Sequence, residues 1–135
     1  KASHSACLGK IHFIGRVQDV KNYYSIADVF VLPTRGDDGR GEGSPVALLE
    51  AMASGIPVIA SNVPGSKDIL AKISDHLFTP NNVSELLNKL NWIFSLNSGR
   101  INTLIQDQLK IIKADYSIER EVRQHENIYS ECLNL

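Results

Sequence analysis

The stretch Gly41-Glu-Gly-Ser-Pro-Val-Ala-Leu-Leu-Glu50 indicates how this chain folds. Ser44 is a favourable N-cap, and Pro45 suits the first helical position, where its missing N–H would have no partner. From Pro45 to Gly55 every residue is apolar or small except Glu50. A helix that is apolar on nearly every side is expected to be buried, so Glu50 is expected to need a partner. The sequence therefore predicts a glycine-rich loop, a capped helix start and a buried helix that ends before Gly55, its C′ residue.

Short apolar runs on either side of this helix are predicted to be strands. They cover Ile11–Ile14, Asp28–Pro33, Pro57–Ala60 and His76–Phe78. The second run has the continuous apolar core of a strand that is covered on both faces. Strands that alternate with helices in this way indicate a parallel sheet flanked by helices.

The predicted helices complete one α/β domain of 135 residues, with a core over 10–80 and a helical tail over 82–133. Asp19 is expected to cap a helix that follows it, and Asn82 with Glu85 resembles a capping box. Besides the helix described above, the predicted helices cover Val20–Ala27, 66–71, 82–96, 100–113 and 118–132.

The composition excludes several classes of function. The chain is 43% hydrophobic and 21% charged, with a formal net charge of −1 and no Lys/Arg block, which argues against a nucleic-acid partner. Its apolar runs are too short to span a membrane, and residues 1–10 lack the apolar centre of a signal peptide. Cys7 and Cys132 lie near opposite ends without metal-ligand spacing, so free buried thiols and no metal site are expected.

Three loops are candidates for a ligand site. In open parallel sheets ligands bind beyond the carboxyl ends of the strands, which selects Gly15–Val17, Pro33–Ser44 and Ser61–Gly65. The second of these joins the glycines to a helix N-terminus, where free backbone N–H groups suit an anion such as a diphosphate.

Two carboxylates accompany that loop. Glu50 can reach back toward the loop and accept two O–H donors, as a ribose diol supplies; it can equally neutralise a buried cation or accept backbone N–H groups. On the residues alone, Glu42 reads as either a ligand or a solvated loop acid. Arg35 and Arg40 would be solvated loop residues or would assist with a phosphate or sugar.

At these residues the chain resembles a known family. Glu42-Gly-Ser-Pro-(four residues)-Glu50, followed by Ala51-Met-Ala-Ser-Gly-Ile-Pro-Val-Ile-Ala60, is similar to the Glu-x7-Glu region of retaining GT-B glycosyltransferases of the family-4-like, group 1 kind. The likeness covers about residues 8 to 133. It includes His12-Phe-Ile-Gly-Arg-Val17, Ala27-Asp-Val-Phe-Val-Leu-Pro33, Ser61-Asn-Val-Pro-Gly65 and Phe78-Thr-Pro80.

The resemblance implies a Rossmann-like, donor-binding C-terminal domain for a nucleotide-diphosphate sugar. Glu50 would bind the ribose hydroxyls, and Glu42 with the Gly43–Ser44 backbone would meet the donor sugar and diphosphate, as a positioning residue rather than a nucleophile. Arg16 and Val17 would contact the base, chiefly through their backbone. Gly15, Pro45 and Arg40 complete the candidate donor-binding residues. No metal or cofactor is expected, since side-chain cations and backbone N–H groups stabilise the departing diphosphate in this family. The anomeric configuration of the sugar would be retained because the acceptor attacks on the same face from which the diphosphate departs.

The chain departs from the family pattern in several places. Asp68 stands where the family usually has Glu, and Pro64-Gly65 where it often has two glycines. The Arg and Lys that grip the diphosphate, and the N-terminal domain that binds the acceptor, are not found. In a Rossmann order of 3-2-1-4-5-6 the first strands are lacking, and the strand at Ile11 would have no neighbour. We therefore expect either an edge open to self-association or a piece of a longer chain, inactive alone.

Three functions remain open from the sequence. The first is the donor-binding half of a retaining hexosyltransferase that builds bacterial surface polysaccharide on a saccharide or lipid-linked acceptor. The second is a non-catalytic nucleotide-sugar-binding or assembly module, and the third is a GT-B sugar-nucleotide epimerase. The expected location is the cytoplasm, either free or peripheral at the inner face of the membrane.

Overall fold

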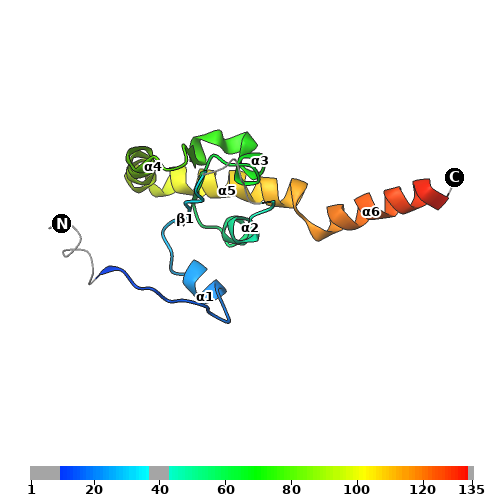
Figure 1. Ribbon diagram of the computed structural model, residues 1–135, viewed down its shortest axis with the longest axis horizontal. Coiled ribbons are helices and arrows are strands. Elements are labelled where there is room, and N and C mark those ends of the chain that lie inside the picture. Colours follow the sequence, from blue (N-terminus) through cyan, green and yellow to red (C-terminus); the bar gives the residue numbers. More distant parts are fainter. Residues whose placement is uncertain (1–9, 37–42, 134–135) are drawn as a thin grey trace.

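A three-stranded parallel sheet lies at the centre of the computed structural model, which describes residues 10–36 and 43–133 (Figure 1). The strand order is β1-β2-β3, with β1 at Phe30–Leu32, β2 at Val58–Ser61 and β3 at Leu77–Phe78. Phe30 pairs with Val58, and Ala60 pairs with Leu77. The prediction of a parallel α/β sheet flanked by helices is confirmed.

Burial differs between the strands because α4 packs on β2 and β3, whereas β1 lies at the edge of the sheet and packs with α2. All four residues of β2 are buried, whereas those of β1 are half-buried. The expectation that β1 is covered on both faces was therefore wrong.

Residues 11–14 form no strand, which contradicts the prediction for Ile11–Ile14. The side chain of Phe13 is 93% exposed, and Ile11 and Ile14 are about half exposed. A strand needs a neighbour for its N–H and C=O groups, and among the described residues the sheet consists of β1, β2 and β3 alone. β-rich composition does not form a strand without such a neighbour.

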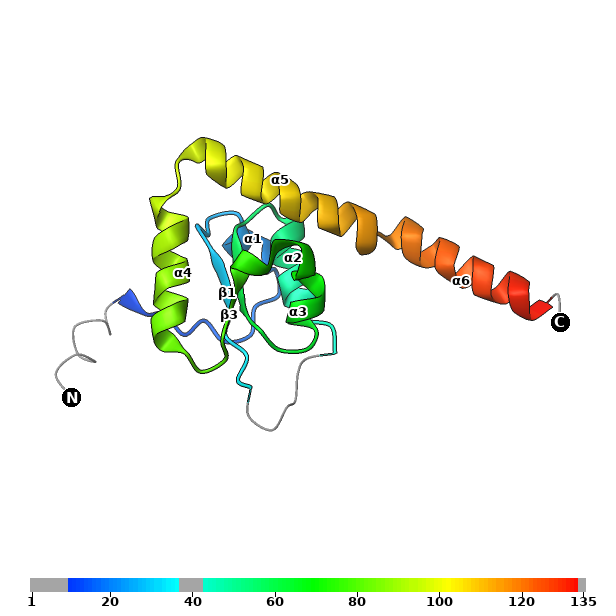
Figure 2. The same cartoon turned by 90° about the horizontal axis from the view of Figure 1, so that it is seen from above.

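Helices cover both faces of the sheet, with α2 and α3 on one side and α4 on the other (Figure 2). α2 packs against β1, β2 and α5. The helices are α1 Lys21–Tyr24, α2 Val46–Ala53, α3 Ser66–Ile69, the 3-10 helix η3 Ala71–His76, α4 Val83–Ser95, α5 Ser98–Asp115 and α6 Ile118–Leu133.

The alternation of side chains along β2 separates two apolar clusters. Val58 and Ala60 face the larger cluster, which includes Leu48 and Met52 of α2. Ile59 points to the other face, where it packs with Phe78 and with Ile93 of α4.

The helix ends follow the predicted caps in part. Asn82 accepts a hydrogen bond from the Glu85 N–H at 3.0 Å, but the Glu85 carboxylate accepts from the N–H of Thr79 rather than from that of Asn82. Asp19 accepts from the Lys21 N–H at 3.0 Å, although α1 is much shorter than the predicted 20–27. Gly55 has φ +74°, as its C′ position requires.

The last helix, α6, lies away from the sheet and has no buried residue (Figure 1). Arg120 joins it to the end of α5 through the Asp115 carboxylate and the Ala114 carbonyl. Cys132 is exposed, so the expectation of a buried thiol was wrong there, because no residue of α6 is buried by the described part of the chain; Cys7 lies outside the described residues. Within 10–36 and 43–133, no helix combines the length and apolar character that crossing a bilayer requires.

Candidate functional site

The carboxyl ends of the three strands meet at one edge of the sheet. The loop after β1 touches the loops after β2 and β3 at Gly36: a Cβ there would lie 2.8 Å from Cβ of Pro80 and 3.9 Å from Cγ1 of Val63. The Asn62 N–H also donates to the carbonyl of Phe78 at 2.8 Å. This close approach requires glycine and brings the three loops together, as the topology predicts for a ligand-binding edge.

The start of α2 lies at this edge. The helix begins one residue later than predicted: Pro45 is the N-cap, with ψ 91°, so Ser44 lies before the cap position predicted for it. Proline lacks the N–H but keeps its carbonyl, which accepts from Leu48 and Leu49. Gly43 and Ser44 are exposed and Pro45 is buried. The first-turn N–H groups of an α-helix point out of its N-terminus, so this end presents donors to an anion.

Glu50 lies on the exposed side of α2, contrary to the prediction of a buried carboxylate. Only Leu48, Ala51 and Met52 of this helix are buried, and Val46 is 62% exposed. One side of α2 packs on the sheet and α5, and the opposite side is exposed at Val46, Ala47 and Glu50. The apolar sequence therefore overstated the burial of Glu50.

The nearest partner of Glu50 is a tyrosine that the sequence did not single out. The Tyr24 hydroxyl donates to Oε2 of Glu50 at 3.5 Å and lies 3.4 Å from the carbonyl oxygen of Ala47, one turn earlier in α2. The Tyr24 ring packs edge-on against Phe30 of β1, with ring centres 6.1 Å apart. Burial, and then the charge and hydrogen bond of Glu50, raise the pKa of Tyr24 above its ordinary value.

The remaining predicted site residues differ in what the structure says of them. Gly15 and Arg16 are exposed and Val17 is half-buried; among the described residues, none of them forms a hydrogen bond with residues 43–50. Arg35 is exposed. Glu42 and Arg40 lie outside the described residues. The structure thus brings together Gly43, Ser44, Pro45 and Glu50, and the ligand roles of all these residues stay predictions.

A metal centre has no candidate in the part of the chain that the structure describes. There, no group of three or more His, Cys, Asp or Glu side chains is placed to hold an ion.

Comparison with protein families gives one match that covers most of the chain. The model of the family described as glycosyl transferases group 1 matches residues 1–95. An uncharacterized glycosyltransferase of Haemophilus influenzae is 30% identical over 120 residues, which are 87% of this chain and 32% of that protein. A putative colanic acid biosynthesis glycosyltransferase, WcaL of Escherichia coli, is 34% identical over 109 residues, which are 77% of this chain and 27% of that protein.

A solved structure shares the fold. The crystal structure of a glycosyltransferase from Rickettsia africae superposes with a TM-score of 0.85 at 22% identity, over 97% of this chain and 34% of that one. The chain thus spans about a third or less of the length of each of these three proteins. With the parallel sheet, the helical tail and the family match all in agreement, the chain belongs to the glycosyltransferase group 1 family and is a GT-B C-terminal domain of that family.

Proposed function

We propose that this chain is the donor-binding part of a retaining glycosyltransferase and binds a nucleotide-diphosphate sugar at the carboxyl edge of its sheet. One observation supports this most directly: the exposed Glu50 follows an exposed helix N-terminus on the same short helix, α2. The helix end suits a diphosphate, and the carboxylate suits a vicinal diol.

The spacing of these two groups agrees with one nucleotide. Glu50 lies four residues after Val46, the first residue of α2, which is about 6 Å along the axis. Side chains on a helix tilt toward its N-terminus, and the Glu50 carboxylate lies with the Ala47 carbonyl within reach of one group, the Tyr24 hydroxyl. A ribose held by Glu50 would therefore direct its diphosphate toward the Gly43–Ser44 backbone.

The remaining roles belong to the same proposal. Glu42 positions the donor sugar, Arg40 assists at the diphosphate, and the Gly15–Val17 backbone meets the base. Catalysis uses no metal, and the configuration at the anomeric carbon is retained. A saccharide or lipid-linked acceptor binds to another part of the full-length protein, which builds bacterial surface polysaccharide at the inner face of the membrane.

Calorimetry with UDP, GDP and ADP tests the ribose assignment. For the nucleotide that binds most tightly, Glu50→Ala is expected to weaken binding by about 1–3 kcal/mol, or roughly 5- to 150-fold, because a charged hydrogen bond is lost. The matched control is Glu119→Ala, an exposed carboxylate of α6. Unchanged affinity in Glu50→Ala would reject the assignment.

Turnover in the full-length protein separates a transferase from a binding module. Glu42→Gln is expected to lower kcat while nucleotide affinity stays within a factor of about two. Tight nucleotide binding without transfer to any acceptor would favour the non-catalytic module, and interconversion of free nucleotide sugars would favour the epimerase.

A further inference from the structure

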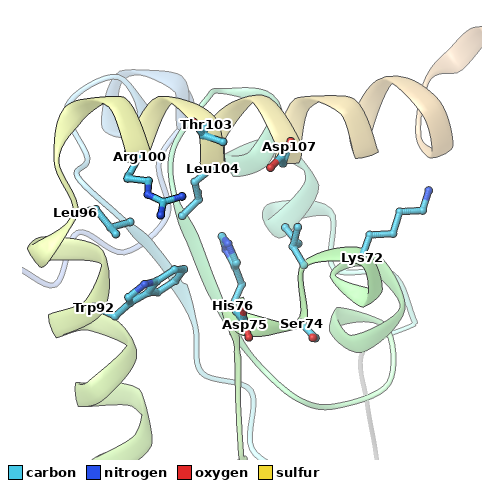
Figure 3. A pocket seen from close by; sticks show the side chains of 11 residues that line it. Lys72, Ser74, Asp75, His76, Trp92, Leu96, Arg100, Thr103, Leu104 and Asp107 are labelled. Carbon is cyan, nitrogen blue, oxygen red and sulfur yellow. The ribbon is translucent and has the colours of Figure 1, made fainter.

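A second hollow lies at the opposite edge of the sheet from the candidate donor site. It has a volume of about 500 Å³ and opens between η3, α4 and α5 (Figure 3). His76 lines it and directly precedes Leu77, the first residue of β3, so the hollow lies at the amino end of that strand. The donor site lies beyond the carboxyl ends, and the two sites share no residue.

His76 presents a hydrogen-bond acceptor to this hollow. The residue is only 4% exposed, and its Nδ1 lies 2.8 Å from the carbonyl oxygen of Val58. A carbonyl only accepts, so Nδ1 carries the proton. Burial lowers the pKa of His76, which keeps the ring neutral at pH 7 and leaves Nε2 as an acceptor. Among the described residues Nε2 has no hydrogen-bond partner, and Figure 3 shows the ring directed into the hollow.

Trp92 and Arg100 form the wall beside His76. The Trp92 ring stands edge-on to the imidazole, with centres 5.5 Å apart and an interplanar angle of 82°. Arg100 lies in the first turn of α5 and lines the hollow, on the same side of it as Trp92 in the view of Figure 3. No carboxylate of the described residues lies within ion-pair distance of Arg100. The positive end of the α5 dipole adds to its charge.

The other charges around the hollow are mostly compensated. Lys72 pairs with Asp115 at 2.6 Å, and Asp107 pairs with Lys110 at 2.8 Å. Lys89 donates to the backbone carbonyl of Asp75 at 2.7 Å. The Arg100 guanidinium and the Asp75 carboxylate remain without an ion-pair partner among the described residues.

We propose that this hollow binds an acidic sugar. The phosphate or carboxylate of the sugar contacts Arg100, the sugar ring packs on Trp92, and a sugar hydroxyl donates to Nε2 of His76. Each part of the wall selects one part of such a ligand. A guanidinium recognises phosphate or carboxylate in a bidentate manner, and an indole ring offers an apolar face to the C–H groups of a sugar. A neutral imidazole with a free acceptor nitrogen, and the Asp75 carboxylate beside it, both favour hydroxyl donors over a bare anion.

The chain contains its own reporter for this proposal, because Trp92 is its single tryptophan. Tryptophan fluorescence is followed during titration with glucose 1-phosphate, which carries a phosphate, and with glucuronate, which carries a carboxylate. A saturable change is expected for at least one of them below about 10 mM, and Arg100→Gln is expected to weaken it roughly tenfold. Arg123→Gln, which removes an exposed cation of α6, is the matched control and is expected to titrate like the parent chain.

Further titrations test the identity of the ligand and separate this site from the donor site. Glucose and inorganic phosphate are each expected to bind at least about tenfold more weakly than the better acidic sugar, since each lacks half of the contacts. Glu50→Ala is expected to leave the fluorescence titration unchanged, which separates this site from the donor site. The proposal is overturned by the absence of saturation with both acidic sugars, by equal affinity in Arg100→Gln, or by equal affinity for inorganic phosphate.

Discussion

The hydroxyl of Tyr24 in α1 lies 3.5 Å from Oε2 of Glu50 in α2, although the two residues are 26 positions apart in the chain. The contact gives the exposed carboxylate a partner beside β1, because the Tyr24 ring also packs edge-on against Phe30. Glu50 is thus held on one side by a neutral donor and is open to solvent on the other, which leaves it able to accept hydroxyl groups of a ligand.

The alkaline stability of the chain depends on this pair. Ionisation of Tyr24 would place a negative charge in a partly buried position beside the Glu50 carboxylate. The pKa of Tyr24 is therefore raised above 10.0 in the folded protein. A group with a raised pKa contributes stability that is present below its unfolded value and is lost as pH rises through its folded value. We expect Tyr24→Phe to lose less stability than the parent chain between about pH 9 and pH 11, as measured by urea unfolding.

Tyr129→Phe on α6 is the control, since Tyr129 is 65% exposed. The pKa of Tyr116 is also raised, by burial and by Asp115, so Tyr116 contributes equally to the loss of folding stability at alkaline pH in both variants. If Tyr24→Phe and Tyr129→Phe follow the same alkaline curve, the Tyr24–Glu50 contact does not exist in solution.

Gln108 fixes α5 to the start of β2. Its side chain is fully buried, its Nε2 donates to the carbonyl of Ile56 at 2.8 Å and its Oε1 accepts from the Val58 N–H at 3.1 Å. We expect Gln108→Leu to destabilise the chain by about 2–5 kcal/mol in urea unfolding, because each buried group left unpaired costs about 1–3 kcal/mol. Gln106→Leu, on the exposed side of α5, is expected to change stability little. A small effect of Gln108→Leu would mean that water replaces the amide.

Gly36 is expected to be intolerant of any side chain. A Cβ would lie 2.8 Å from Cβ of Pro80, so the loop after β1 would have to move away from the loop after β3. Gly36→Ala should lower the free energy of unfolding by about 1–3 kcal/mol, the usual cost of overpacking. Gly43→Ala is the matched control, because, apart from its chain neighbours, no atom of residues 10–36 and 43–133 lies within 4 Å of its added Cβ. Equal thermal stability of the two variants would show that the loops do not touch.

The sequence predicted elements whose signals lie within a few residues of each other. β1, β2 and β3 and the three tail helices α4, α5 and α6 were found because each has its own apolar pattern, and Asn82 marked the start of α4 through a local cap. The strand at Ile11–Ile14 failed because a strand depends on a neighbour, which local composition does not reveal. Residues 11–14 have side chains that favour a strand, but the described part of the chain gives them no neighbouring strand to pair with.

The arrangement of the candidate site was predictable only in part. A parallel sheet predicts that the loops after its strands meet at the carboxyl edge, and the structure brings the loops after β1, β2 and β3 together there; the binding of a ligand stays a prediction. The sequence does not reveal the exposure of Glu50, because an apolar run predicts a helix that is covered on all sides, whereas only Leu48, Ala51 and Met52 of α2 are buried. Tyr24 and Gln108 were missed because each acts across 26 or more positions of the chain, through packing that no local pattern encodes.

His76 makes the stability of the chain sensitive to mild acid. Its folded pKa is lowered from 6.5, chiefly by burial, so the unfolded chain takes up a proton before the folded one. The neutral His76 ring therefore makes its full contribution to the free energy of unfolding above pH 6.5. That contribution is lost as pH falls from 6.5 toward the pKa of the folded state. Glu85 and Asp115, whose lowered pKa values start from 4.5 and 3.8, lose their stabilisation only at lower pH.

Thermal unfolding between about pH 7.5 and pH 5 therefore isolates His76 from these carboxylates. His76→Asn keeps a side-chain donor for the Val58 carbonyl but cannot titrate, so its melting temperature should fall less over this range than that of the parent chain. His125→Asn, on the exposed α6, should follow the parent curve. If His76→Asn shows the same acid slope as the parent, the imidazole is already solvated in the folded state. The acceptor nitrogen that the acidic-sugar site requires would then face water rather than a ligand.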